Sequence, residues 1–193
     1  MKITMLRSRT IVELYGVFVV TFVLAGPLTG KAGANLVTNP GFESGLTGWT
    51  TNGFFAQGFD FGIDSQAHSG NNAFFGGAIG GLGFLTQTIP TVGGFFSISL
   101  WLQSDGFLPN EFQVRVNNNV ILDRTDILIA PYTQINLGFL PTSPTTTLSF
   151  GFRNDSGFLH LDDISVNLVP EPANIALLGF GLAALAWKRR KVT

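Results

Sequence analysis

The sequence predicts an all-β protein in which one β-sandwich lies between two apolar terminal segments. Apolar and polar residues alternate with a period of two from Phe95 onward, as in half-buried strands. No stretch of 35–169 keeps a 3.6-residue apolar period for three turns, and glycine, proline and asparagine separate the short apolar runs. The 193 residues have room for one core plus terminal segments. We therefore predict a single sandwich at 35–169 rather than a parallel α/β sheet.

The strands follow from the alternation itself. From Phe96 to Gln103 the even-numbered residues are apolar and face the core, while the odd-numbered residues face water. The same pattern recurs in three further stretches, 112–116, 135–139 and 147–153. The run Asn117–Asn119 favours a tight hairpin, because asparagine tolerates the left-handed conformation that such turns need. This hairpin would pair 112–116 with 120–123.

Composition excludes several classes of function. Charged residues make up 12% of the chain and the net charge is -1, so no basic surface for nucleic acid is expected. The absence of cysteine excludes disulfides, thiolate metal sites and cysteine nucleophiles. The glycine-rich run 76–83 lacks a following helix and a Lys-Ser/Thr pair, which predicts a loop rather than a phosphate site.

The first 34 residues have the order of a signal peptide. Lys2, Arg7 and Arg9 precede an apolar run at 14–25, and Ala32 and Ala34 precede Asn35 as a signal peptidase requires. Signal peptidase is therefore expected to cut before Asn35. The alternative is a permanent membrane anchor, although the apolar run is shorter than the roughly 20 residues that a span prefers.

The last 24 residues combine three features. Pro170, Glu171 and Pro172 precede an apolar stretch at 173–187, which predicts a short transmembrane helix. The basic tail follows directly, as Lys188, Arg189, Arg190 and Lys191. Four cations beside an apolar helix hold that end in the cytoplasm, so the preceding domain lies outside.

These residues resemble the PEP-CTERM sorting signal. The resemblance implies export, transient retention in the inner membrane, recognition and cleavage by an exosortase near 170–172, and release to the cell surface or an exopolysaccharide matrix. The alternative is an ordinary tail anchor that is never cleaved.

Three further landmarks resemble galactose-binding-domain-like jelly rolls, a group that includes many carbohydrate-binding modules. They are the opening stretch 35–49, the small-residue turn at 67–73 and the closing strand at 161–166. The resemblance implies a jelly-roll sandwich over 35–169, with Trp49 packed inside.

The same resemblance implies a structural calcium ion held by Glu43 and Asp162, with backbone carbonyls of 68–72. Calcium prefers six to eight oxygen ligands, so carboxylates and carbonyls suit it. In the alternative, Glu43 accepts hydrogen bonds from turn amides and both Asp162 and Asp163 lie at a solvated strand end.

Catalysis is not expected. His68 and His160 are the two histidines, and no nucleophile elbow or zinc-binding helix motif accompanies them. Asp162 and Asp163 are adjacent on a predicted strand and would point to opposite faces, which does not suit a glycosidase pair.

Sugar binding needs flat aromatic faces with planar polar groups beside them. Five outward positions offer this combination if their strands are neighbours: Trp101, Gln103, Gln113, Arg115 and Arg153. Trp101 has an equal alternative as a rim aromatic covered by a loop. Seven phenylalanines between 54 and 84 either fill the core or form an exposed apolar patch that favours self-association.

The sequence as a whole predicts an exported surface or matrix protein whose sandwich binds polysaccharide without catalysis. The alternative is a structural or adhesion protein of the matrix with no sugar site.

Overall fold

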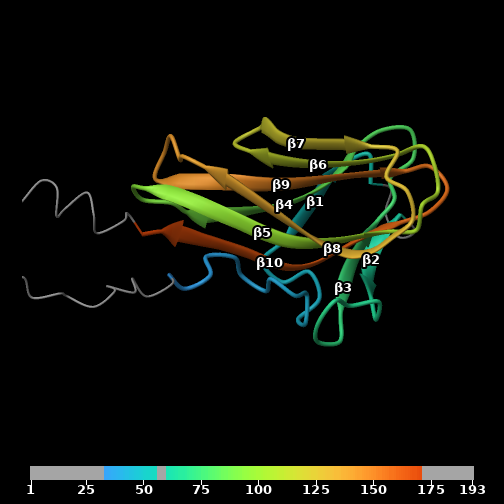
Figure 1. Ribbon diagram of the computed structural model, residues 1–193, viewed down its shortest axis with the longest axis horizontal. Helices are drawn as coiled ribbons and strands as arrows, with labels where there is room; N and C mark the ends of the chain where they lie inside the picture. The colour runs from blue at the N-terminus through green and yellow to red at the C-terminus, as the bar shows by residue number, and fades with distance from the viewer. Residues whose placement is uncertain (1–32, 56–59, 171–193) are drawn as a thin grey trace, which may run out of the picture.

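The protein is a two-layer β-sandwich (Figure 1). The computed structural model describes residues 33–55 and 60–170. Within these ranges there are ten strands, arranged in two five-stranded sheets whose paired neighbours are all antiparallel. The first sheet has the spatial order β1 (Thr50–Gly53), β4 (Gly83–Pro90), β9 (Thr145–Asn154), β6 (Asn110–Val116) and β7 (Asn119–Thr125). The second sheet has the order β2 (Phe61–Asp64), β3 (Ala73–Gly76), β10 (Leu159–Val169), β5 (Phe95–Ser104) and β8 (Ala130–Phe139). The predicted all-β sandwich is therefore confirmed.

Strand β5 shows the predicted alternation. Its even-numbered residues are buried, and its odd-numbered residues are partly or fully exposed. The hairpin between β6 and β7 also forms where expected, with Asn117 and Asn118 at φ of 48° and 66°. In the register of this hairpin Val116 faces Asn119 and Arg115 faces Val120. Local sequence therefore determines these elements.

The core lies between the two sheets and is built largely from aromatic rings. Phe42, Phe74, Phe112, Phe150 and Phe152 are all fully buried. The ring centroids of Phe74 and Phe152 lie 5.1 Å apart, in a tilted contact that joins the two sheets. Within the first sheet, the centroids of Phe112 and Phe152 lie 5.3 Å apart in an edge contact. A ring-rich interior of this kind supplies the packing that a chain without cysteine needs.

Trp49 lies inside, as the resemblance implied. Its side chain is 6% exposed, and its Nε1 donates a hydrogen bond to the Asn39 carbonyl at 3.1 Å. This bond satisfies the polar atom of a buried indole.

The phenylalanines between 54 and 84 divide between the two expected roles. Phe74 is fully buried, and Phe55 and Phe61 pack against the core. Phe54 is 61% exposed, while Phe84 lies on the outer face of the first sheet. Phe59 falls outside the described residues. The region is thus mainly core, with individual rings on the surface.

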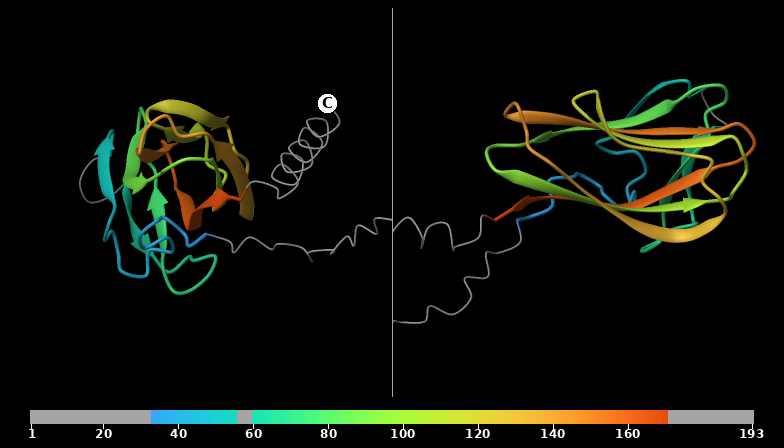
Figure 2. Two further views of the ribbon diagram at one scale, coloured as in Figure 1. Left: turned by 90° about the vertical axis from the view of Figure 1, so that its left-hand side faces the viewer. Right: turned by 45° about the horizontal axis from the view of Figure 1, so that its top comes forward.

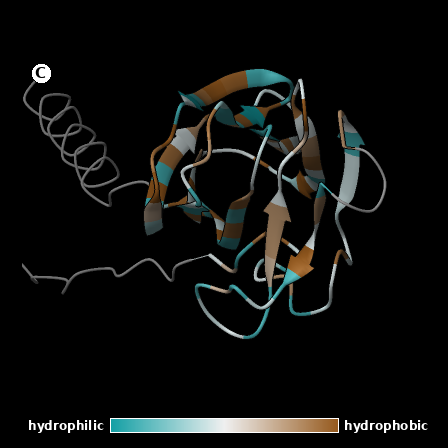
Figure 3. Ribbon diagram, turned by 90° about the vertical axis from the view of Figure 1, so that its right-hand side faces the viewer, coloured by the Kyte–Doolittle hydropathy of each residue, from teal (hydrophilic) through white to brown (hydrophobic). Residues whose placement is uncertain are grey.

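Both ends of the described chain lie at the same end of the sandwich (Figures 1 and 2). Asn35 Nδ2 donates to the Ile164 carbonyl at 2.9 Å, and the Leu36 amide donates to the Val166 carbonyl at 3.0 Å. We call this the tether end, because Pro170 leaves the sandwich here. The opposite, loop end carries the connections after β3, β5, β7 and β9, and Figure 3 views the molecule from that side.

The predicted terminal segments fall outside the described residues. These are residues 1–32 of the signal peptide, which include Ala32, the transmembrane helix at 173–187, and the motif residues Glu171, Pro172, Lys188, Arg189 and Arg190. Over 33–55 and 60–170, no helix has the length and apolar character that crossing a membrane requires.

Candidate functional site

The five predicted ligand-binding residues do not form one surface. Trp101 and Gln103 lie on the outer side of β5 in the second sheet. Gln113 and Arg115 on β6 and Arg153 on β9 lie on the outer side of the first sheet. The core separates the two groups. Strands β6 and β9 are neighbours, but β5 belongs to the other sheet, so the condition under which the five residues would form one surface is not met. Alternation reports the side of a strand but not its sheet.

Trp101 is covered by the segment between β2 and β3. The His68 ring stacks on the Trp101 indole with centroids 3.8 Å apart and planes inclined by 15°. His68 is fixed in turn by Asp163, since Nδ1 and Oδ2 lie 2.6 Å apart. A tryptophan that already has a ring on one face matches the rim alternative better than an open sugar platform.

The outer side of the first sheet presents a different arrangement. The Arg115 guanidinium carbon lies 4.3 Å from the centre of the Phe84 ring, a cation–π contact. In the register of the sheet Phe84 faces Gly151 on β9, and Gly151 faces Gln113 on β6. A side chain at Gly151 would not fit, because its Cβ would approach Phe84 Cε1 to 2.8 Å. We call Phe84, Gly151, Gln113 and Arg115 the Phe84 face.

Hydrogen bonds fix the polar groups of this face. Gln113 Nε2 donates to Glu111 Oε1 at 2.9 Å and to Asp123 Oδ2 at 3.0 Å. Arg115 Nε donates to Gln113 Oε1 at 2.9 Å. Among the residues that the structure describes, no acceptor contacts the Nη groups of Arg115. The guanidinium is therefore held by its Nε and its ring contact, with its outer donors available to a ligand.

Arg153, at the edge of this face, is engaged with Asp155. Its Nε and Nη2 donate to Asp155 Oδ1 and Oδ2, both at 2.9 Å. This pair lowers the pKa of Asp155 to about 2 and raises that of Arg153. Arg153 consequently contributes less donor capacity to a ligand than Arg115 does.

Sequence reasoning does not single out Phe84 as a candidate binding residue. It treats Phe84 together with the other phenylalanines of 54–84, which either fill the core or form an exposed patch, yet the pattern of β4 separates Phe84 from them. Phe84, Thr86 and Thr88 alternate with the buried residues Leu85, Gln87 and Ile89. This alternation would have identified the ring as outward-facing.

Asp162 and Asp163 do not point to opposite faces, so that prediction is wrong. The register of β10 against β5 shifts between Asp162 and Ser165, and Asp163 has a φ of 48°. Both carboxylates therefore meet the same turn. Asp162 Oδ2 accepts the amides of His68 and Ser69 at 2.8 and 3.1 Å, while Asp163 Oδ1 accepts the Ser69 hydroxyl at 2.8 Å.

This cluster is not arranged as a catalytic triad. Ser69, His68 and Asp163 are in contact, but the Ser69 hydroxyl bonds to the carboxylate rather than to the imidazole. A nucleophile needs a base within hydrogen-bond reach. Here the Ser69 hydroxyl and the His68 imidazole both bond to Asp163 instead, which holds the turn against β10. The second histidine, His160, is buried, and its Nε2 lies 3.0 Å from Oδ2 of Asp64.

The two carboxylates that the resemblance assigns to calcium are engaged with amides. Glu43 Oε1 accepts the Asn71 and Asn72 amides at 2.7 and 3.0 Å, which lowers the pKa of Glu43. Burial raises the pKa of Asp162, although the backbone amides that bond to its carboxylate act to lower that pKa. In 33–55 and 60–170, no group of three or more His, Asp or Glu side chains surrounds a metal position. Glu43 therefore accepts turn amides as in the alternative, whereas Asp162 is buried and does not lie at a solvated strand end. Calcium at Glu43 and Asp162 stays a prediction.

Comparison with solved structures identifies the fold. The galactotriose-bound module TmCBM61 aligns with a TM-score of 0.57 and 15% identity, covering 70% of this chain and 99% of that chain. The CBM22-1 xylan-binding domain of Paenibacillus barcinonensis Xyn10C aligns with a TM-score of 0.55 and 17% identity, covering 73% and 98%. The K3 cleaved adhesin domain of Lys-gingipain from Porphyromonas gingivalis W83 gives 0.54 and 15%, covering 68% and 96%. Identities this low establish a shared fold alone.

A comparison with the curated proteins finds no match to this chain, whereas a family model recognises the C-terminal signal. The family model of the PEP-CTERM protein-sorting motif matches residues 168–191, which implies processing by an exosortase and indicates an exported protein sorted to the cell surface. The chain therefore carries a PEP-CTERM sorting motif behind a β-sandwich with the fold of carbohydrate-binding modules.

Proposed function

We propose that this is an exosortase-sorted surface or matrix protein whose sandwich binds polysaccharide, without catalysis, through the Phe84 face. The observation that carries the proposal is the stack of Arg115 on Phe84 beside Gln113. It combines an aromatic ring on β4 with a planar donor group and a planar amide on β6, across Gly151 of the intervening strand β9. Sugar recognition requires these groups together, because a sugar ring has apolar C–H surface and hydroxyls on its edges.

The proposed ligand is a neutral polysaccharide. Arg115 offers its outer donors on this face, and the carboxylates of Glu111 and Asp123 both accept hydrogen bonds from Gln113 beside it. Charges of opposite sign are therefore interspersed, and an anionic chain would meet carboxylates as well as arginine. The hydrogen bonds among these side chains already fix their rotamers, which reduces the entropy lost when a ligand binds.

Binding to a polysaccharide panel tests the proposal. We would titrate the purified chain and its Arg115→Ala variant with soluble β-1,4-galactan and xylan by calorimetry. Loss of the outward donors and of the ring contact is expected to weaken binding roughly tenfold or more, about 1.4 kcal/mol. Arg124→Ala is the matched control, because Arg124 is exposed on β7 and faces away from Asp123. Equal affinities of the two variants would contradict the proposal.

The second candidate function is adhesion without a sugar site. It is favoured by the likeness to the Lys-gingipain adhesin domain and by apolar side chains exposed at the tether end, such as Val92, Phe95 and Leu140. A folded chain that binds none of the polysaccharides would favour this function.

A further inference from the structure

Exposed apolar side chains gather at the tether end. In the register of the second sheet, Val169 at the end of β10 faces Phe95 at the start of β5, and the end of β8 lies on the other side of β5. The turn between β4 and β5 adjoins these strand ends. Exposed fractions in the group run from 39% for Val169 to 78% for Val92. We call the following residues the tether patch: Val92, Phe95, Leu140, Leu168 and Val169.

Close contacts with two glycines join the parts of the patch. Leu168 lies against the β4–β5 turn, since a Cβ at Gly94 would approach Leu168 Cδ1 to 2.6 Å. The Phe95 ring lies over Gly138 of β8, where any side chain would overlap it. The apolar groups of three strands and one turn are therefore held next to one another while they remain accessible to a partner.

The tether end is also uncharged over the residues that the structure describes. The chain segments that meet here, 33–35, 90–95, 139–145 and 167–170, contain no Asp, Glu, Lys or Arg. A contiguous apolar surface without charges typically marks a site of interaction with a protein or a membrane.

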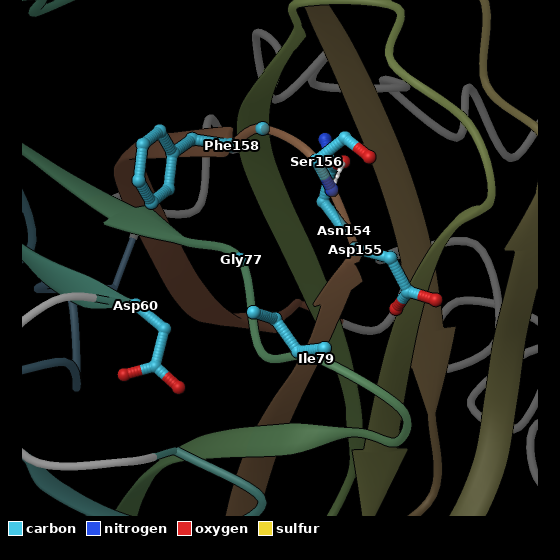
Figure 4. Close-up of a pocket in the computed structure, with 8 residues that line it drawn as sticks. Asp60, Gly77, Ile79, Asn154, Asp155, Ser156 and Phe158 are labelled. Carbon is cyan, nitrogen blue, oxygen red and sulfur yellow. Dashed lines mark hydrogen bonds between the residues drawn. The ribbon is translucent and has the colours of Figure 1, made fainter.

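The acidic residues lie away from this end. Residues 33–55 and 60–170 contain ten Asp or Glu and three Arg. At the loop end, Asp105 and Asp126 follow β5 and β7, while Asp60 and Asp155 line a pocket (Figure 4). Although Asp155 is paired with Arg153, this end is acidic as a whole. An anionic lipid surface would therefore repel the loop end and leave the uncharged tether end free to approach.

The length of chain beyond β10 places a lipid surface next to the patch. The predicted transmembrane stretch begins at Ala173, so an extended chain from Val169 spans at most about 14 Å. The headgroup layer on one side of a bilayer is roughly 5–8 Å thick. The tether patch consequently lies at the headgroups, or within a few ångströms of them, whenever this stretch is in a membrane.

The predicted span is short, which draws the patch still closer. A helix over 173–187 would rise about 22 Å, against a hydrocarbon thickness of roughly 30 Å. A span shorter than the hydrocarbon thickness is accommodated in part by its flanking residues, which move toward the membrane. Leu168 and Val169 are the apolar flanking residues here.

We propose that the tether patch is a membrane-docking surface, which rests among the lipid headgroups while the C-terminal segment is attached. The inference rests on the sorting part of the proposed function and not on its ligand. Docking would hold the motif at 170–172 at the membrane surface and point the loop end away from it. Cleavage near this motif would leave the patch as the remaining contact, and so small an apolar surface binds lipid reversibly. After release the same side chains are exposed, as the second candidate function requires.

Fluorescence quenching by a membrane lipid tests the docking. Because the sequence has no cysteine, one introduced cysteine carries a fluorophore at a chosen place. The full chain would be reconstituted in vesicles of phosphatidylethanolamine and phosphatidylglycerol that include a lipid with a nitroxide near the top of its acyl chain. Val92→Cys labels the tether patch, and Leu128→Cys labels an equally exposed aliphatic position at the loop end. We expect roughly threefold stronger quenching at Val92, because interfacial apolar groups lie about 5–10 Å deep in the headgroup and acyl boundary.

Charge substitutions separate docking from the nearness that the covalent connection alone imposes. With the label at Val92, Leu140→Glu and Phe95→Glu each place a carboxylate in the patch. Each should reduce the quenching roughly twofold or more, because a charge is costly to bring next to the apolar layer. Ile129→Glu is the matched control, since Ile129 is exposed at the loop end, and it should leave the quenching unchanged. Urea midpoints of the variants would verify that each remains folded.

Four results would overturn the inference. The first is equal quenching at Val92 and Leu128, and the second is quenching at Val92 that both patch variants retain. The third is a label at Val92 that is shielded from water until the protein is diluted in the membrane but is not quenched, which would assign the patch to a second copy of the chain. The fourth is a chain that does not associate with the vesicles.

Polysaccharide titration keeps this test distinct from that of the proposed ligand. Leu140→Glu lies outside the Phe84 face and should keep the polysaccharide affinity of the unmodified chain. A chain that binds no polysaccharide but shows the expected quenching would contradict the Phe84 face and support the tether patch. Polysaccharide binding together with equal quenching at Val92 and Leu128 would do the reverse.

Discussion

Asp162 is a fully buried carboxylate whose oxygens accept three backbone amides. Oδ2 accepts those of His68 and Ser69, and Oδ1 accepts that of Asp163 at 2.7 Å. Both oxygens therefore face N–H donors, and neither position accommodates an NH₂ group. The carboxylate holds the segment between β2 and β3 against the closing strand.

The isosteric change Asp162→Asn tests this role. Whichever way the amide is turned, its NH₂ group faces a backbone donor, so a buried bond is lost and we expect destabilisation of about 1–3 kcal/mol in urea unfolding. Asp126→Asn is the control, because Asp126 is exposed and has a φ of 52° that asparagine tolerates. It should change stability by less than about 0.5 kcal/mol. If the two variants unfold at the same urea concentration, Asp162 does not hold the turn.

Single residues also show where sequence reasoning stops. The burial of Trp49 and the outward direction of Arg115 followed from pattern and resemblance, and the structure confirms both. The convergence of Asp162 and Asp163 could not be predicted, because it depends on an extra residue in β10 and on a left-handed Asp163. A bulge breaks the period of two on which face assignments rest.

Among the elements, the β6–β7 hairpin is encoded most locally. Asn117 and Asn118 occupy successive left-handed positions, and the Asn117 side chain accepts the Thr147 amide at 2.9 Å. No hydrogen bond from the Asn118 side chain to a described residue is present. The contribution of Asn118 is therefore its tolerance of a positive φ, as hairpins of this kind require.

Substitutions at Asn118 isolate this contribution. Alanine in the left-handed region costs about 1–2 kcal/mol, whereas glycine adopts it without strain. We expect Asn118→Ala to lower the free energy of unfolding by about 1 kcal/mol and Asn118→Gly to leave it unchanged or raised, measured in urea. An alanine variant as stable as the glycine variant would show that the turn relaxes to another conformation.

Strand length explains which elements were predicted. The ten-residue strand β5 and the seven-residue strand β6 show several cycles of alternation, so their faces could be assigned. Strands β1 and β2 have four residues each, and Gly53 and Gly62 interrupt their patterns. Two cycles at most are too few to separate a short strand from a loop.

The segment between β2 and β3 is clamped from two sides, by Glu43 and by Asp162. Because backbone amides occupy both carboxylates, we expect the same thermal midpoint with calcium and with a chelator. A site would instead raise the midpoint as the free calcium concentration increases, because a ligand that binds the folded state alone stabilises it. Scanning calorimetry at several calcium concentrations distinguishes these outcomes. A rising midpoint would establish the calcium site that the family resemblance implies.

At the scale of the whole molecule, the arrangement of the sheets decides which side chains meet. Strands β5 and β6 are consecutive in sequence, yet they lie in different sheets. Trp101 and Gln113 are thus separated by the core although the connection between their strands is short. Alternation carries no information on sheet order, so the candidate site could be predicted residue by residue but not as a surface.

The tether end predicts how the folded part depends on the sorting motif. The last buried residue of β10 is Val166, while Leu168 and Val169 are 42% and 39% exposed. A chain that ends at Pro170 should therefore keep its urea midpoint and its polysaccharide affinity but lose retention at the cell surface, since the matched motif continues to 191. Immunoblots of cell and medium fractions would check the localisation.

A chain that ends at Ile164 is the control and should not fold. It lacks Val166, which pairs with β5 and forms hydrogen bonds with Asn35 and Leu36. Loss of folding on truncation at Pro170 would show that the motif is part of the sandwich rather than an address attached to it.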